Sequence, residues 1–422
     1  METKVNRPGY TEGLALFQHP VTDVGHGGNK WVEYRPINQL TEGAPLEFVV
    51  APTASTYIDL ERTYLYVKAK LVKGDGTAIA KTELVVPSNL LLHTMFSQVD
   101  LSLQQTSVSQ LGAHYPYKAY LDVLLNTVDS QELEPQMFFK DQIDMEDTNL
   151  AQPKNMAILS RYAVIHESKM FDMMGPLQLD MAQQDRYLLN GVPLTLKLWP
   201  SSDKFRIMAS DATQKYKVLI SDASLKVCHV KINPNILIAQ NELLKSTPAL
   251  YPYQKSNLKT FSLPAGQFSF TADDLFQGEV PTSLILGIVS SSAYNGDYGK
   301  NPFNFKNYDC NFVGFYVNGE SVPTHPYTPN YRTSIYLDLY QTLNHKGSSR
   351  AVPIGRADYG NGYSLYRFEF VGDTPLTSPS MRGHTRLELK FGTALPETCT
   401  VIVYAKFAAL MKVDQARSIS LL

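Results

Sequence analysis

Only a few residue groups in the chain have types and spacing that suggest chemistry, and the first is the stretch at 295–300. Its sequence, NGDYGK, has some features of a phosphate-binding loop, in which backbone N–H groups and a lysine hold nucleotide phosphates. The first glycine is missing at the required spacing, and neither Ser nor Thr follows Lys300. The favoured interpretation is therefore a glycine-rich turn. The hydrolase motifs G-x-S-x-G and H-E-x-x-H do not occur in the chain.

Histidine and cysteine side chains are the usual soft metal ligands, but their spacing here does not favour a metal site. None of the nine histidines pairs with another four residues away, and none pairs with a cysteine at ligand spacing. Cys228 and His229 are adjacent in an expected strand, so their side chains point to opposite faces. The three cysteines are far apart and indicate no disulfide framework.

Acidic residues cluster at two places, at Asp273-Asp274 and at Asp144, Glu146 and Asp147. A catalytic carboxyl pair needs one member in an apolar pocket that raises its pKa. Because both clusters lie in polar sequence, solvated loop faces are the favoured interpretation. We therefore expect no catalytic, cofactor-binding or metal-binding residues, and a protein that is not an enzyme.

The composition favours a folded chain rich in strands. Hydrophobic residues make up 44% of the 422 residues and charged residues only 18%, the reverse of a disordered chain. The chain has 25 Tyr and 19 Phe, which favour strands. A net charge of −2 is unlike that of a typical nucleic-acid binder. No stretch approaches the roughly 20 apolar residues of a membrane span, and without a signal region we expect a reducing compartment.

Hydrophobic and polar residues alternate with a period of two in several segments. Such alternation is typical of half-buried strands with one face on a core. Many short strands separated by Gly and Pro turns are typical of a sandwich or barrel. The alternation is clear at 64–71, 98–103, 194–198, 386–391 and 401–407. We therefore predict an all-β fold with a few short helices.

Helical periodicity is sparse. Residues 117–124 carry apolar side chains at i, i+3, i+4 and i+7, with Pro116 just ahead, so we expect a short helix on a sheet edge. Residues 236–245 are a second candidate, bracketed by prolines. We interpret 233–257 as the connection between two domains.

This connection divides the chain into an N-terminal domain at 1–232 and a C-terminal domain at 258–422. Two long segments, 127–158 and 341–364, lack any period, and the first is rich in acidic residues. Long polar loops in a compact domain usually serve a function at the surface. We therefore expect both segments to be surface excursions.

The two halves indicate one fold used twice. With an offset of 216 residues, Phe96 meets Phe312 in two expected strands. Leucines at 194–198 meet apolar residues at 387–391 with an offset of 193. The offset of 216 also aligns one tripeptide with another, namely Tyr120, Leu121 and Asp122 with Tyr336, Leu337 and Asp338. Agreement in order and spacing indicates an internal duplication, and two such domains fit a double jelly-roll, a pair of eight-stranded sandwiches.

The sequence also contains eight longer phrases that match a known family: LERTYLYVKAKLV (60–72), FSQVDLSL (96–103), YPYKAYLDVLLN (115–126), QDRYLLNGV (184–192), YKVLISDASL (216–225), NPFNFKNYDCNF (301–312), YGNGYSLYRF (359–368) and LPETCTVIVYAKF (395–407). With these phrases the chain resembles the major capsid protein of the Polinton (Maverick) self-synthesising transposons and of the related adintoviruses. The resemblance covers about residues 45–415 and is weakest in the N-terminal arm and in 127–158.

The resemblance implies a double jelly-roll of the lineage shared with virophages and adenoviruses. It also implies a homotrimer. Three chains with two jelly rolls each supply six similar blocks, which form a pseudo-hexameric capsomer that tiles an icosahedral shell around double-stranded DNA. A single jelly-roll penton protein then occupies the vertices. The implied location is the virion capsid, with synthesis in the host cytoplasm and assembly in the nucleus or cytoplasm.

Aromatic residues outside the alternating segments are candidates for trimer or surface contacts. Tyr is frequent at protein interfaces, where its ring packs and its hydroxyl forms hydrogen bonds. Simple packing of a loop explains such residues equally well. The candidates are Tyr327, Tyr331, Phe138 and Phe139.

Basic residues near the chain ends are candidates for contact with packaged DNA. They are Lys4, Arg7, Lys412 and Arg417. Four charges give only weak, salt-sensitive contact, and solvated termini are the favoured interpretation.

Two alternatives stay open. A two-domain β-sandwich that binds or processes glycans needs paired carboxylates in a cleft or a tryptophan platform, and the chain has only Trp31 and Trp199. A domesticated capsid gene, kept by a host for another role, has the same strand pattern as a capsid gene of an active element.

Overall fold

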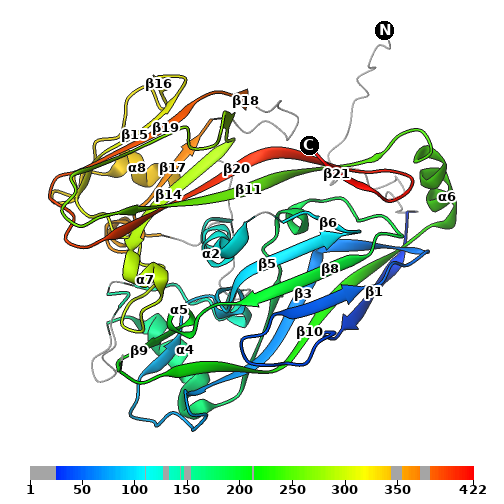
Figure 1. Cartoon of the computed structure of the whole chain (residues 1–422), viewed down its shortest axis with the longest axis horizontal. Helices are drawn as coiled ribbons and strands as arrows, with labels where there is room; N and C mark the ends of the chain where they lie inside the picture. The colour runs from blue at the N-terminus through cyan, green and yellow to red at the C-terminus, as the bar shows by residue number, and fades with distance from the viewer. Residues whose placement is uncertain are drawn as a thin grey trace, which may run out of the picture.

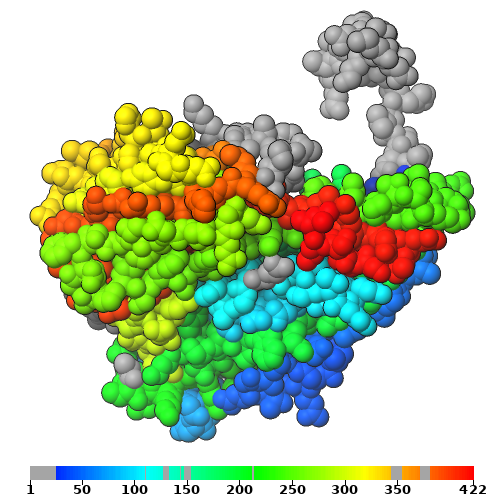
Figure 2. Space-filling view, turned by 45° about the horizontal axis from the view of Figure 1, so that its top comes forward, coloured from blue at the N-terminus to red at the C-terminus, as the bar shows by residue number. Residues whose placement is uncertain are grey.

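The computed structural model describes residues 25–109, 111–126, 133–142, 144–146, 154–211, 213–343, 354–370 and 381–422. These residues form two β-sandwiches with a few short helices. Figure 1 shows the N-terminal sandwich, coloured blue to green, below the C-terminal sandwich, coloured green to red. In Figure 2 the two halves meet along a close seam.

In the described residues, the N-terminal half contains ten strands. They are β1 (His26–Tyr34), β2 (Leu46–Val50), β3 (Thr56–Lys73), β4 (Val85–Pro87), β5 (Phe96–Leu103), β6 (Thr106–Ser107), β7 (Phe171–Pro176), β8 (Leu194–Pro200), β9 (Ile207–Ala209) and β10 (Tyr216–Ile232). Sheet A has the order β1-β10-β3-β7 and sheet B the order β2-β8-β5-β6. Strands β4 and β9 form a small separate sheet.

The C-terminal sandwich is built in the same way. Its strands are β11 (Ala249–Leu263), β12 (Ser269–Asp273), β13 (Glu279–Val280), β14 (Ser283–Ser290), β15 (Cys310–Val317), β16 (Glu320–Ser321), β17 (Leu365–Glu369), β18 (Met381–Arg382), β19 (Thr385–Phe391), β20 (Cys399–Val413) and β21 (Ile419–Leu421). Sheet C has the order β11-β20-β14-β17, with β21 beside β20, and sheet D the order β12-β19-β15-β16. Strands β13 and β18 pair separately.

The two sandwiches share one topology. If the eight strands of the paired four-stranded paths are numbered along each half, sheets A and C both have the order 1-8-3-6, and sheets B and D both have the order 2-7-4-5. All of these strand pairs are antiparallel. This is the arrangement of a jelly roll, so the double jelly-roll predicted from the sequence is confirmed.

Strand register corrects one detail of the predicted duplication. Leu103 and Val317 each stand just before the two-residue turn between the fourth and fifth strands of their sandwich, so these strands correspond with an offset of 214. Leu103 lies opposite Leu194, and Val317 lies opposite Thr385, so the seventh strands correspond with an offset of 191. Each predicted offset, 216 and 193, is therefore wrong by two residues in the strands, and a pattern of period two looks the same after any even shift.

The helices are few and mostly short. They are α1 (Leu91–Thr94), α2 (Tyr115–Asn126), α4 (Met156–Ile165), α5 (Asp203–Arg206), α6 (Pro234–Leu243), α7 (Ser291–Asn295), α8 (Leu337–Leu343) and α9 (Arg356–Gly360), with 3-10 turns η2 (Gly112–His114), η3 (Glu134–Gln136), η4 (His166–Ser168) and η5 (Asp180–Gln183). Helices α2 and α6 confirm the two predicted helices. The expected connection at 233–257 contains α6 and the first part of β11, and the exact domain division stays a prediction. Within the described residues, no helix has the length and apolar character needed to span a membrane.

Candidate functional site at the joint between the two sandwiches

Helix α2 lies at the joint between the two sandwiches (Figure 1). Pro116 stands in its first turn, where a missing N–H costs little. A surface helix exposes one side to water, but every α2 residue from Tyr115 to Leu125 is buried. The N-terminal core packs on one side of the helix, and side chains of the C-terminal half pack on the other. Polar side chains of α2 must therefore find partners inside the protein.

Four charged side chains meet between α2 and sheet C. Lys118 Nζ lies 2.7 Å from Asp122 Oδ2 and 3.3 Å from Asp180 Oδ1. Lys406 Nζ lies 2.9 Å from Asp122 Oδ1. Lys118 and Asp122 come from α2, Asp180 from η5, and Lys406 from β20. We call these four residues the joint charge cluster, in which two positive and two negative charges compensate.

Neutral donors complete the hydrogen bonding of the cluster. Ser256 donates its backbone N–H and its hydroxyl to the two oxygens of Asp180, each at 2.7 Å. The Tyr404 hydroxyl donates to Asp122 Oδ1 at 2.9 Å. Buried ion pairs are tolerated when their remaining lone pairs are satisfied. Groups of the C-terminal sandwich therefore donate hydrogen bonds to both carboxylates of the N-terminal half.

The cluster favours the charged state of Asp122 and Lys118. Burial alone would raise the pKa of Asp122, but Lys118 and Lys406 hold that pKa well below its usual range. Burial alone would lower the pKa of Lys118, whereas Asp122 and Asp180 raise it. A general acid or base needs a pKa near the working pH. The arrangement therefore fits a role in holding the two halves together better than a role in catalysis.

Aromatic rings fill the rest of the joint. Tyr120 stacks on Phe303, with ring centroids 4.0 Å apart and planes inclined by 6°. Tyr117 meets the edge of Phe303 at 5.5 Å and stacks on Tyr294 at 5.6 Å. Its hydroxyl donates to the Pro302 carbonyl at 3.1 Å. Residues of both halves thus share one hydrophobic core, and the joint is packed like the interior of a domain.

Several described residues of 133–146 are buried at the joint. Asp141 is fully buried, and its carboxylate accepts a hydrogen bond from Arg161 Nη2 at 2.9 Å. Asn301 of the C-terminal half donates to the other carboxylate oxygen at 3.1 Å. The expectation of a surface excursion is therefore wrong for the buried residues such as Asp141, because polar side chains that bond to one another can be buried, whereas Glu134 and Gln142 are exposed as expected. The other residues between 127 and 153 lie outside the described part of the chain.

His93 is buried beside the joint and predicts a pH dependence of stability. Its ring nitrogens lie 2.8 Å from the Tyr115 hydroxyl and 2.9 Å from Gln136 Oε1. Burial lowers its pKa from 6.5 to about 4. Below pH 6.5 the unfolded chain binds a proton that the folded chain binds only below about pH 4. The free energy of unfolding therefore falls as the pH decreases through this window, by roughly 3 kcal/mol in full.

The variant His93→Gln is expected to flatten this part of the pH profile, measured as the urea midpoint between pH 6.5 and 4. Burial also lowers the pKa of His114 and His229, so a smaller slope remains. The pKa of Asp122 is lowered from 3.8, which places its contribution below this window. The pKa of Glu397 is lowered from 4.5, so its contribution begins only at the acidic end of the window. A slope equal to that of the unmodified chain would contradict the assignment to His93.

Most of the described residues singled out for chemistry lie close to an oppositely charged side chain. Lys300, at the end of the NGDYGK stretch, donates to Glu397 Oε2 at 2.7 Å. Burial alone would raise the pKa of Glu397, but Lys300 and the hydrogen bonds from Ser290 and Tyr308 lower it to about 2. The acidic candidates lie within ion-pair distance of cations or a histidine: Asp144 of Lys154, Glu146 of Lys306, Asp273 of Arg386, and Asp274 of His384. Asp147 lies outside the described residues.

The cysteines and potential metal ligands are not arranged for reactivity. In the described ranges, no three His, Cys, Asp or Glu side chains are placed to hold a metal ion. All three cysteines are buried and free. Burial raises the pKa of Cys310 to about 12 and that of Cys399 to about 11. Such thiols are poor nucleophiles because the thiolate is the reactive form.

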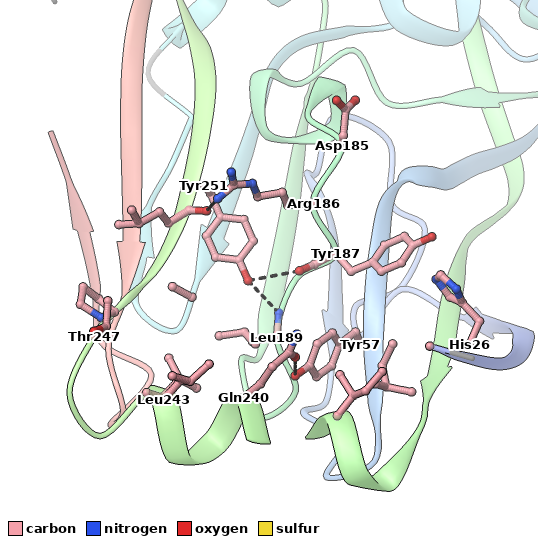
Figure 3. A pocket seen from close by; sticks show the side chains of 17 residues that line it. His26, Tyr57, Asp185, Arg186, Tyr187, Leu189, Gln240, Leu243, Thr247 and Tyr251 are labelled. Carbon is pink, nitrogen blue, oxygen red and sulfur yellow. Dashed lines mark hydrogen bonds between the residues drawn. The ribbon is translucent and has the colours of Figure 1, made fainter. Parts of the chain in front are cut away.

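A pocket of about 630 Å³ lies where α6 and β11 meet the N-terminal sandwich (Figure 3). The Tyr251 hydroxyl accepts from the Leu189 N–H and donates to the Tyr187 carbonyl, each at 3.1 Å. The Tyr57 hydroxyl donates to Gln240 Oε1 at 2.5 Å. The bonds of Tyr251 connect the C-terminal half with the N-terminal half, and the bond of Tyr57 connects the N-terminal half with α6. The pocket wall is therefore a second part of the joint.

Eight residues carried the comparison of the two halves, and their burial is unequal. Those of the N-terminal half, Phe96, Tyr120, Leu121 and Asp122, are all buried. In the C-terminal half Tyr336 is buried, Phe312 is half-buried, and Leu337 and Asp338 are exposed. The tripeptide lies in the middle of α2 but at the start of α8. Leu337 and Asp338 of the second copy are therefore exposed to solvent, whereas the corresponding Leu121 and Asp122 of the first copy are buried in the joint.

The four candidate contact residues differ in exposure. Phe138 is only 3% exposed and packs 6.0 Å from the Tyr120 ring, so it has little surface for a neighbouring chain. Phe139, Tyr327 and Tyr331 are half-buried. Their part in contacts between chains stays a prediction.

Sequence reasoning found Asp122 as part of a repeat but missed its partners Lys118, Asp180 and Lys406. One signal was present, because Lys118 and Asp122 are four residues apart and such pairs face each other on a helix. Asp180 and Lys406 are distant in sequence, and no local pattern connects them to α2.

No family model matches the chain. An uncharacterized protein of Caenorhabditis elegans, F54H12.2, is 25% identical over 425 residues, which cover 94% of this chain and 98% of that protein.

Solved structures match over nearly the whole chain. A chain of the Sputnik virophage has a TM-score of 0.64 at 12% identity, covering 99% of this chain and 93% of that chain. The Faustovirus major capsid protein has a TM-score of 0.59 at 9% identity, with coverages of 94% and 92%. The mavirus major capsid protein has a TM-score of 0.54 at 9% identity, with coverages of 100% and 96%. The fold and the joint together define a double jelly-roll protein. The solved structures that share this fold include viral major capsid proteins.

Proposed function

We propose that the chain is a major capsid protein whose homotrimers form pseudo-hexameric capsomers of an icosahedral shell around double-stranded DNA. The observation that carries the proposal is the shared fold over both jelly rolls, which covers 99% of the chain against the Sputnik virophage and 100% against mavirus. The role is structural rather than enzymatic.

The joint supports this proposal physically. A shell built from repeated contacts needs subunits of constant shape, because each misplaced block spoils several neighbouring contacts. Lys406 and Phe303 of one half are packed and bonded to Asp122 and Tyr120 of the other. Each chain therefore contributes a rigid pair of similar blocks, and three chains supply six.

The finer proposal concerns the source and the partners. The phrases shared with Polinton and adintovirus capsid proteins point to such an element, and a nearly full-length relative in Caenorhabditis elegans fits a gene carried in animal genomes. An active element and a domesticated capsid gene both fit these findings. A penton protein at the vertices, weak DNA contact through the chain ends, and assembly in the nucleus or cytoplasm belong to the same proposal, as does the domain division at 233–257.

The glycan-binding alternative has little support in the geometry. Trp31 lies on sheet A and stacks on Tyr64, whereas Trp199 lies on sheet B and donates to Asp100. The two rings therefore do not form one platform, and the acidic candidates lie close to cations or a histidine.

Light scattering after size exclusion is the test, followed by negative-stain microscopy of the peak. The expected result is a particle of three times 47.2 kDa, with hexagonal plates or closed shells at higher concentration. Many weak contacts between trimers then add up to a stable shell. A stable monomer that forms no plates across a range of salt and pH would overturn the proposal of autonomous assembly.

A further inference from the structure

Sheets A and C are equivalent by topology, yet their outer faces differ in exposure. On sheet C, Tyr404 is 1% exposed and bonds to a residue of α2. On sheet A, Trp31 is 48% exposed and stacks on Tyr64 at 5.4 Å, and Met174 is 40% exposed. In Figure 1, β1 and β10 lie below β5 and β8, on the side away from the C-terminal sandwich. The same face carries charged side chains, among them Glu33 opposite Lys226. Exposed aromatic side chains with charged residues around them are common at protein interfaces.

Strand register identifies which residues of the two sheets correspond. In sheet C, Lys406 stands in the row of paired residues that ends at Glu369, the last residue of β17. In sheet A, Lys226 stands in the row that ends at Pro176, the last residue of β7. Lys226 is therefore the equivalent of Lys406. Its ammonium group lies 5.3 Å from the centre of the Tyr66 ring.

Helices α2 and α8 occupy equivalent places in the chain, because each is the first described α-helix between the fifth and sixth strands of its sandwich. In α2, Leu121 and Asp122 are at most 2% exposed, and Asp122 binds Lys406. Their counterparts at offset 216, Leu337 and Asp338, are exposed, Leu337 by 45%. Helix α8 thus presents to solvent the apolar and acidic positions with which α2 covers sheet C.

We propose that the outer face of sheet A is covered by α8 of a second copy of this chain. Ile335, which is 65% exposed, and Leu337 pack against the aromatic side of the sheet near Trp31. Asp338 pairs with Lys226, as Asp122 pairs with Lys406 inside each chain. The contact between chains then repeats the joint within a chain.

This arrangement specifies a ring. Sheet A and α8 are different surfaces, so the contact is heterologous, and such contacts close into a ring when the rotation allows it. Each copy offers one of each surface, and a closed trimer leaves neither unpaired. The inference rests on the proposed trimeric capsomer and assigns the residues that form its contacts.

Charge reversal tests the assignment. Trimer dissociation constants are measured by analytical ultracentrifugation for the unmodified chain, for Lys226→Glu, for Asp338→Lys, and for the combined variant. Each single change is expected to weaken the trimer by about a hundredfold, since it places like charges together in a buried contact. The combined variant restores opposite charges and is expected to recover to within about tenfold of the unmodified chain.

Lys231→Glu is the matched control, because Lys231 is an exposed lysine on the same strand, and its trimer is expected to be unchanged. Circular dichroism checks that every variant is folded. A trimeric unmodified chain whose affinity responds to neither single change, or whose combined variant stays dissociated, would overturn the interface and leave the capsid proposal standing. An unmodified chain that stays monomeric would overturn both.

Discussion

Replacing Lys118 by methionine is expected to lower the free energy of unfolding by about 3–5 kcal/mol, because removal of one partner leaves buried charges uncompensated. Lys118 is fully buried and lies within 3.3 Å of two carboxylates. Methionine fills a similar volume, so the expected loss comes from charge rather than from a cavity. Of the two lysines, only Lys118 reaches Asp180 within ion-pair distance. The measurement is urea denaturation followed by circular dichroism.

Two further variants separate charge from packing. In the combined variant Lys118→Met with Asp180→Asn, the carboxylate that loses its cation is removed as well, and Asp122 keeps Lys406. Stability is therefore expected to lie above that of Lys118→Met alone. Lys245→Met removes the lysine of an exposed pair with Glu242, and a change below about 1 kcal/mol is expected there. Equal losses at Lys118 and Lys245 would show that the joint charge cluster contributes no more than a surface pair.

The cluster has a physical consequence for assembly. A purely apolar joint tolerates sliding of one half over the other, since hydrophobic contact has no preferred direction. Hydrogen bonds and ion pairs fix distance and orientation, and Asp122 and Asp180 each bond to groups of the C-terminal half. The angle between the two jelly rolls is thereby specified, and in a pseudo-hexameric ring this angle must match the angle between neighbouring chains.

Most of the fold could be predicted because strands repeat a simple local pattern. The segment 64–71 alternates, and the structure buries Leu65, Val67 and Leu71 to 1% exposure or less. The same reasoning assigned the opposite face of 401–407 to the outside. There it was incomplete, because Tyr404 is also buried, covered by the other sandwich rather than by its own.

The joint could not be predicted because its signals are not local. Lys118 and Asp141 are polar residues, and polar residues are usually exposed. Their burial depends on partners far away in sequence, such as Asp180 for Lys118 and Asn301 for Asp141. A composition rich in Asp and Glu therefore indicated a surface loop at 127–158, although several of its described residues belong to the interior.

Replacing Phe303 by alanine is expected to lower the free energy of unfolding by about 3–5 kcal/mol, the usual cost of deleting a buried ring. Phe303 is fully buried, stacks on Tyr120 at 4.0 Å and meets the edges of Tyr117 and Phe205 at 5.5 and 6.1 Å. Three rings of the N-terminal half thus lose their contact with this C-terminal ring. The resulting cavity lies in the joint itself. Urea denaturation measures the loss.

Because Phe303 lies in the joint, its replacement is expected to weaken the coupling between the two halves as well as to lower stability. A second fully buried ring, on a strand of the N-terminal sandwich, separates these two effects. Phe48 lies on β2 of the N-terminal sandwich, so Phe48→Ala is expected to destabilise that sandwich by a similar amount. Phe303→Ala is expected to weaken the coupling between the halves, so that the two sandwiches unfold at separate urea concentrations. Near-ultraviolet circular dichroism would then show two transitions. Phe268→Ala, at a 59% exposed ring, is expected to change little. If Phe303→Ala and Phe48→Ala gave the same single transition, the ring would be an ordinary core residue. The rigidity of the joint would then have to come from the charged side chains alone.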